Sequence, residues 1–118
     1  MYCDLLEHLL LHILICESPS PDANPMEAVG IGGIVNFIVP ELNDVYSGWK
    51  TTLTWQQNCH DQIVNDKDTY MLLLKRVKTS CEGYPTYEER KLLRSYNARF
   101  GKWPIDNNKP LFQEIMRL

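Results

Sequence analysis

The sequence predicts a mainly α-helical protein, folded as a single domain of about five or six helices over residues 1–118. Apolar residues recur at helical spacing along most of the chain, and proline and glycine fall between these stretches, where helices begin and end. The composition is that of a globular protein, with 44% hydrophobic and 23% charged residues. A chain of 118 residues is long enough for one modest core.

The first predicted helix spans residues 4–17 and has Asp4 as its N-cap. It contains the most apolar run of the chain, and apolar side chains lie on nearly all of its sides. Such a helix must be covered on more than one side, so we expect it at the centre of the fold. The run is too short and too polar to span a membrane, and we expect no membrane contact.

Prolines and glycines divide the following segment. A loop is predicted around Pro19 and Pro21, and then a helix over residues 25–39 that Pro40 ends or kinks. A short helix follows through Tyr46, with Gly48 as its C-cap. The glycines at 30, 32 and 33 do not match the dinucleotide-binding pattern GxGxxG. We interpret them as small residues that let helices approach closely.

Residues 49–80 are predicted to form two helical segments with a break at residues 65–66. Thr52 or Thr54 is the expected cap of the first segment, and Asp66 or Asp68 that of the second.

A further helix is predicted over residues 86–100, opened by a capping box of Thr86 and Glu89. Its expected buried side is formed by Leu92, Leu93, Tyr96 and Phe100, and Gly101 follows as the C-cap. The last predicted helix covers residues 111–117, after Pro110.

Two histidines of the first helix, His8 and His12, are four residues apart and therefore project from the same face. They can be hydrogen-bonded residues at the edge of a core helix. They can also be two ligands of a divalent metal, although two ligands do not complete a site. Both interpretations remain open from the spacing, and the expected metal site is weak because Glu7 is poorly placed to be a third ligand.

The stretch CDLLEHLLLHILI resembles the helix that closes the motif of HNH (ββα-metal) endonucleases. The resemblance covers residues 1–17, and it implies that His8 is the metal-binding histidine and His12 an auxiliary or orienting one. It also implies a divalent metal, Mg, Mn or Zn, held through His8. The catalytic histidine and the asparagine of that family lie upstream of this helix, and this chain begins at Met1.

The resemblance therefore implies an HNH endonuclease-like C-terminal region whose parent activity is metal-dependent DNA cleavage. We expect this chain alone to be inactive, because it offers no convincing base to activate water. A missing N-terminal segment or a partner protein would have to supply that base. The alternative is a non-catalytic helical module for protein interaction.

Charge is unevenly placed along the chain. Residues 1–49 contain no Lys or Arg, whereas residues 50–118 hold all 12 basic residues, and the net charge is −3. The C-terminal helices, residues 83–118, are basic and aromatic. DNA is the partner that this pattern suggests, although a solvated helix surface gives the same pattern. The candidate nucleic-acid-binding residues are Lys75, Arg76, Lys78, Arg90, Lys91, Arg94 and Arg99.

The four cysteines, Cys3, Cys16, Cys59 and Cys81, are widely separated and form no CxxC pair, which argues against a zinc ribbon. No basic segment precedes the apolar run, as a signal peptide would require. We therefore expect reduced thiols and a cytoplasmic location. A nucleophilic pair of Cys59 and His60 is disfavoured, because adjacent residues of a helix do not face each other.

Overall fold

The computed structural model describes residues 4–18, 29–84 and 87–118. Within these ranges all regular elements are helical and no strand forms, which confirms the predicted fold class. The longer helices of this part are α1 (Leu5–Glu17), α3 (Val39–Tyr46), α4 (Thr54–Ile63), α5 (Lys67–Cys81) and α7 (Lys109–Met116). No helix in these ranges is long and apolar enough to cross a membrane.

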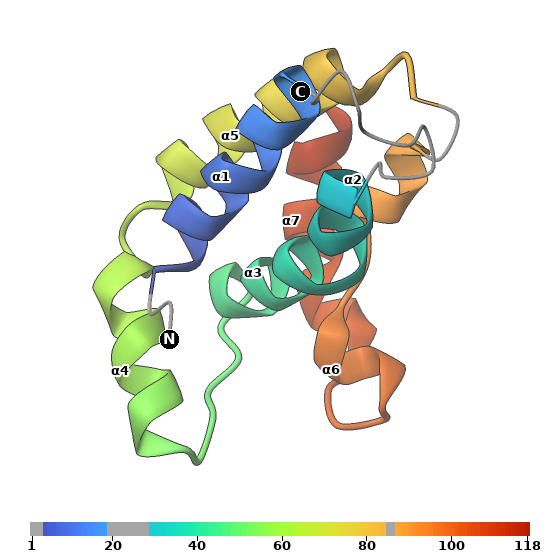
Figure 1. The fold of residues 1–118 in the computed structure, drawn as a ribbon. Helices are drawn as coiled ribbons and strands as arrows, with labels where there is room; N and C mark the ends of the chain where they lie inside the picture. The colour runs from blue at the N-terminus through green and yellow to red at the C-terminus, as the bar shows by residue number, and fades with distance from the viewer. Residues whose placement is uncertain (1–3, 19–28, 85–86) are drawn as a thin grey trace.

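Helix α1 lies at the centre, as its composition predicts. It runs beside α5 on one side and contacts the segment that begins with α2 (Val29–Gly33) on the other (Figure 1). Its N-cap is Asp4, whose Oδ1 accepts hydrogen bonds from the backbone N–H groups of Leu6 and Glu7 at 2.9 and 3.1 Å. Leu9 and Ile13 are fully buried.

The main core surrounds α1 and contains residues of all the other long helices. Helix α4 contributes only its last residue, Ile63. The fully buried apolar side chains of this core are Leu9, Ile13, Ile34, Val39, Leu42, Tyr70, Leu74, Val77, Cys81 and Leu92.

Pro40 neither ends nor interrupts the second helical segment. Helix α2 continues through one π-helical turn, η1 (Ile34–Ile38), directly into α3, and Pro40 occupies the first turn of α3. Proline has no N–H to donate to the carbonyl of Asn36, one turn earlier. That oxygen instead accepts from Nη2 of Arg99 at 3.3 Å. The predicted start of this helix at Pro25 lies outside the described residues, whereas Gly48 ends α3 with a φ of 98°, as expected of a C-cap.

Residues 49–81 form two helices, α4 and α5, with a break at residues 64–66, as predicted, but α4 begins later than expected. Residues 49–53 are not helical, and neither Thr52 nor Thr54 caps α4. Thr51 makes the local bonds instead: its Oγ1 accepts from the Leu53 N–H at 3.1 Å, and its own N–H donates to Gln57 Oε1 at 3.0 Å. Asp66 occupies the N-cap position of α5 without a side-chain cap bond.

The predicted helix over residues 86–100 does not form. The chain makes a 3₁₀ turn, η2 (Glu89–Leu92), and then a single helical turn, α6 (Tyr96–Arg99). The reason is Asn43 of α3, whose Nδ2 donates to the carbonyls of Leu92 and Arg94 at 2.9 and 2.8 Å. A continuous helix would use those carbonyls itself.

The predicted buried side of that segment is accordingly only partly correct. Leu92 is buried, but Tyr96 and Phe100 are 38% and 56% exposed. Thr86, and with it the expected capping box, lies outside the described residues. Helix α7 begins at Lys109 and ends at Met116, close to the prediction.

The cysteines differ from the expectation of four reduced thiols. Cys59 takes part in a disulfide bond, so the expectation is wrong at this position. Cys16 and Cys81 are free thiols in the core.

Candidate functional site

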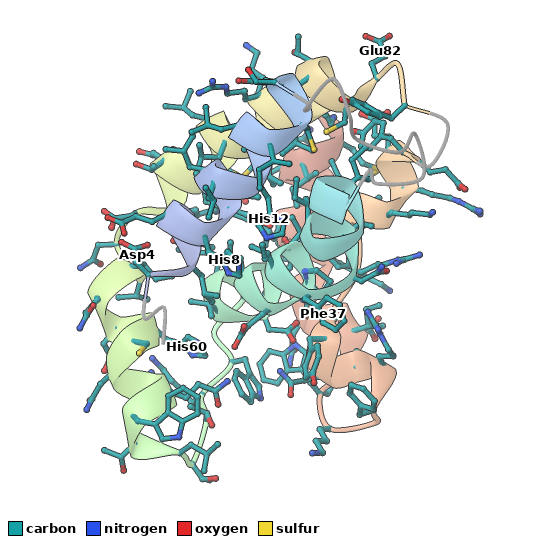
Figure 2. All side chains as sticks on the ribbon, in the orientation of Figure 1. Asp4, His8, His12, Phe37, His60 and Glu82 are labelled. Carbon is teal, nitrogen blue, oxygen red and sulfur yellow. The ribbon has the colours of Figure 1, made fainter. Side chains whose placement is uncertain are left out.

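The two histidines of α1 lie against each other. Their Nε2 atoms are 3.1 Å apart, and their rings meet edge to face with centroids 4.8 Å apart (Figure 2). The other ring nitrogen of His12, Nδ1, lies 3.2 Å from the carbonyl oxygen of Gly30. A carbonyl only accepts, so Nδ1 of His12 carries the hydrogen. Nε2 of a neutral His12 is then the acceptor of the pair, and Nε2–H of His8 donates to it.

Glycines of the neighbouring helix make room for this arrangement. A Cβ placed on Gly33 would lie 2.5 Å from Cε1 of His12, so the imidazole ring occupies the space of a side chain. Gly30 is also close to α1, since its Cβ would lie 2.7 Å from Cys16 Sγ and 3.0 Å from the His12 carbonyl oxygen. The sequence-based interpretation of these glycines as sites of close helix approach therefore holds at both positions.

Burial, and secondly the neighbouring His12, lower the pKa of His8. Both effects favour the neutral imidazole, which is the form that binds metals. The described residues contain no group of three or more His, Cys, Asp or Glu side chains that could hold a metal. The pair therefore offers two nitrogen ligands, one of them oriented by a backbone carbonyl, as ligand histidines commonly are.

The third histidine is in a different part of the molecule. His60 of α4 lies apart from His8 and His12 (Figure 2). It is buried, and its Nε2 lies 3.3 Å from Oε1 of Glu41 on α3, which also accepts from Gln56 at 3.0 Å. Its Nδ1 is buried and has no hydrogen-bond partner. His60 is thus not brought together with the histidine pair of α1.

Glu41 also lines a cavity of about 520 Å³. Trp49 and Tyr96 contribute aromatic rings to its walls, and Lys50 and Lys102 contribute positive charge. A carboxylate and two ammonium groups of this kind suit a polar ligand with charges of both signs. Glu41 carries no signal of this cavity in the sequence, because it is separated from the aromatic and basic residues along the chain.

The candidate nucleic-acid-binding residues separate into two groups. One group forms ion pairs within the chain and is largely neutralised: Arg76 with Glu17, Lys78 with Glu89, and both Arg90 and Lys91 with Glu88. Lys75, Arg94 and Arg99 form no ion pair with a described residue. Of these, Lys75 is exposed on α5, whereas the structure brings Arg94 and Arg99 together.

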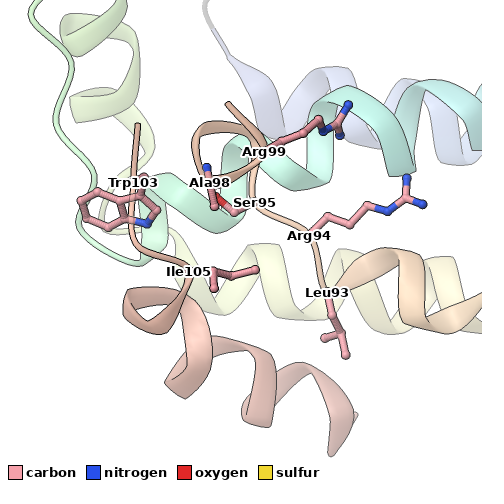
Figure 3. A pocket seen from close by; sticks show the side chains of 7 residues that line it. All are labelled: Leu93, Arg94, Ser95, Ala98, Arg99, Trp103 and Ile105. Carbon is pink, nitrogen blue, oxygen red and sulfur yellow. The ribbon is translucent and has the colours of Figure 1, made fainter. Parts of the chain in front are cut away.

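Arg94 and Arg99 flank one end of a cavity of about 560 Å³. Figure 3 shows both guanidinium groups extending to the same side, with Trp103 and Ile105 at the other end of the cavity. Both arginines bind Asn36 of η1: Nη1 of Arg94 donates to its Oδ1 at 2.9 Å, and Nη2 of Arg99 to its carbonyl oxygen. Asn36 is neutral, so it orients the two guanidinium groups without an ion pair. The nearby carboxylate of Glu88, which pairs with Arg90 and Lys91, also feels the charge of Arg94.

A buried carboxylate holds the cavity residues in place. Asp44 of α3 is fully buried and accepts hydrogen bonds from Ser95 Oγ at 2.5 Å, from both the backbone N–H and Nδ2 of Asn97, and from Nδ2 of Asn108, each of these three at 2.9 Å. Asn108 in turn accepts from Nε1 of Trp103 at 2.6 Å. Sequence reasoning missed this centre, because an Asn-Asp pair within an apolar helix stripe carries no signal of its distant partners.

Comparison with family models, curated proteins and solved structures finds no match for this chain. The HNH-like resemblance of residues 1–17 therefore rests on those residues alone.

Proposed function

We propose that the chain is a non-catalytic binding module for single-stranded nucleic acid, which it holds over the cavity of Arg94 and Arg99. The observation that carries the proposal is a pair of guanidinium groups that form no ion pair with a described residue and are both bound by one asparagine at the edge of a cavity. Guanidinium groups held in this way suit successive phosphates of a nucleic-acid backbone.

Exposed aromatic side chains favour a single strand over a duplex. Phe37 follows Asn36 in the chain and is 62% exposed. Tyr96 and Phe100 form an exposed edge-to-face pair on and beside α6, with ring centroids 5.2 Å apart. Aromatic rings beside cationic groups stack on bases, and only unpaired bases offer their faces. These rings belong to the same segments as Asn36, Arg94 and Arg99, so the segments that orient the arginines also carry the stacking groups that a single strand requires.

The nuclease-like ancestry implied by the resemblance of α1 fits the same ligand, since DNA is the substrate of that family. Cleavage is not part of our proposal. It would need a metal with open coordination positions and a base near it. The only histidine besides the pair of α1 contacts Glu41 in another part of the molecule.

The proposal is tested by fluorescence anisotropy with a labelled single-stranded oligonucleotide at several salt concentrations. We expect binding at low salt, and at least tenfold weaker binding by the double variant Arg94→Gln/Arg99→Gln. The slope of log affinity against log salt should fall by about 1.4, since each lost phosphate contact on a single strand is worth about 0.7.

The matched control is the double variant Arg76→Gln/Arg90→Gln, which removes the same charge from arginines that are already in ion pairs. It should bind nearly as the parent does. Equal weakening by both variants would show that only net charge matters and would contradict a specific role of Arg94 and Arg99. No binding at low salt would contradict the proposal and favour the protein-interaction module.

A second candidate function is the binding of a divalent transition metal by His8 and His12. The specific observation is their Nε2 separation of 3.1 Å. Two imidazole nitrogens on one tetrahedral zinc ion are about 3.3 Å apart, because each Zn–N bond is about 2.05 Å long. Binding should be weak, since water must complete the coordination, and a metal on His8 Nε2 must displace its hydrogen.

Calorimetric titration with zinc or nickel tests this candidate. His8→Ala should abolish uptake, whereas His60→Ala should leave it unchanged, because His60 contacts Glu41 and not the pair. Uptake that survives His8→Ala would move the metal site elsewhere and remove the support that metal binding gives to the HNH-like resemblance.

A further inference from the structure

Two free cysteines meet where the ends of α1 and α5 lie side by side (Figure 1). Cys16 is in the last turn of α1 and is 6% exposed, and Cys81 is the last residue of α5 and is fully buried. Both side chains belong to the same buried cluster, and each thiol affects the pKa of the other, so the two are neighbours. The sequence alone gives no sign of this pairing, since the two residues are far apart in the chain.

The residues next to the two cysteines hold the helix ends in register. Glu17 accepts from Nε of Arg76 at 2.7 Å and from Oγ of Ser80 at 2.6 Å, and Ser80 directly precedes Cys81. The hydroxyl of Tyr84 donates to the Cys16 carbonyl at 2.6 Å. These bonds join the same two helix ends on either side of the thiols.

Cys16 Sγ packs directly against the backbone of α2. A Cβ on Gly30 would lie 2.7 Å from this sulfur, so the glycine leaves the thiol the space that a side chain would take. A disulfide requires the two sulfurs to approach to about 2.05 Å.

We propose that Cys16 and Cys81 are a redox modification site, at which the two thiols form a reversible intramolecular disulfide between the ends of α1 and α5. Cys59 already belongs to a disulfide and does not compete for either thiol.

A small-molecule disulfide such as oxidised glutathione is the oxidant. One protein thiolate attacks it, a mixed disulfide forms, and one glutathione thiolate leaves. The second protein sulfur then attacks the mixed disulfide and releases the other glutathione. The Sγ–Sγ bond forms as the reagent's S–S bond breaks, and the two protein protons end on the two released thiols.

Burial sets the rate of this exchange. It raises the pKa of both thiols, that of Cys81 to about 12, with the neighbouring Cys16 as the second cause. Few thiolates are therefore present at neutral pH, and the first attack should be slow and should become faster as the pH rises.

The disulfide would close the chain from residue 16 to residue 81, which includes α3, α4 and most of the core. Closing so long a loop restricts the unfolded chain far more than the folded one, in which the two side chains are already neighbours. We therefore expect the oxidised form to unfold at a temperature about 10 °C higher than the reduced form.

The experiment incubates the full chain with mixtures of oxidised and reduced glutathione and maps disulfides by mass spectrometry after trapping free thiols. We expect a peptide pair joined through Cys16 and Cys81, the loss of both trappable thiols and the rise in Tm. Cys16→Ala and Cys81→Ala should each lose the rise in Tm, and the remaining thiol should carry glutathione or stay free.

The parent chain keeps the test decisive if a variant fails to fold, because peptide mapping needs no substitution. Both thiols remaining trappable in strongly oxidising mixtures at pH 9 would overturn the proposal. A disulfide that joins either cysteine to a second copy of the chain, or to Cys59, would overturn it as well.

Discussion

Replacing Asp44 by alanine should be the most damaging single substitution around the cavity of Arg94 and Arg99. The carboxylate is fully buried and accepts from four donors of Ser95, Asn97 and Asn108. Each bond to a charged acceptor is worth about 1.5–3 kcal/mol, but the donors share one partner and relax together. We expect a loss of about 5 kcal/mol in the free energy of unfolding.

This loss is large for a chain of this size. Domains have about 0.05–0.15 kcal/mol of stability per residue, which gives about 6–18 kcal/mol here. Asp44→Asn should lose less free energy of unfolding than Asp44→Ala but still be less stable than the parent, because it keeps one acceptor oxygen but turns an amide donor toward other donors.

Urea denaturation followed by far-ultraviolet circular dichroism measures the effect. The control is Asp106→Ala, since Asp106 pairs only with Lys109 and its side chain is 76% exposed. An exposed pair of this kind contributes at most about 1 kcal/mol. A loss of about 1 kcal/mol or less in Asp44→Ala would refute the argument that this carboxylate organises residues 92–108.

Three further outcomes are expected. Gly33→Ala should destabilise the fold by about 1–3 kcal/mol in the same assay, because its Cβ meets the His12 ring. The control Gly32→Ala, whose Cβ meets only an ordinary contact at 4.0 Å, should be neutral or stabilising. Equal losses of stability in the two variants would contradict the role of the ring. Hydrogen bonds from Arg76, and secondly from Ser80, lower the pKa of Glu17 to about 2 from 4.5. The stability that Glu17 contributes is therefore present above about pH 4.5 and is lost as the pH falls through 2. A difference in urea midpoint between the parent and Glu17→Gln that persists undiminished at pH 2 would contradict this. Purified chain should not nick plasmid DNA with magnesium, manganese or zinc, and nicking that is lost in both His8→Ala and His60→Ala would show that His60 acts as the base.

The central helix shows how far local sequence signals reach. Its length, its N-cap Asp4 and its central position follow from one apolar run and one capping residue, and the structure confirms them. The positions of Gly48 and Gly101 at helix ends follow in the same way, because both adopt a positive φ that other residues avoid.

The predicted helix over residues 86–100 shows where such signals fail. Its helical spacing is present in the sequence, but Asn43 of α3 binds two of its carbonyls and Asp44 binds its later donors. Local propensity is worth tenths of a kcal/mol per residue, so a few buried hydrogen bonds from a distant helix outweigh it.

The candidate sites divide along the same line. Spacing alone placed His8 and His12 on one face of a helix, because residues four apart on a helix always share a face. Only the tertiary structure decided that Arg94 and Arg99 meet at Asn36 while Arg76 is neutralised by Glu17, and that Cys16 lies beside Cys81. The sequence by itself thus determined what depends on neighbours along the chain. Charge compensation and thiol pairing depend on which distant surfaces pack together, and packing is fixed by the burial of the whole core.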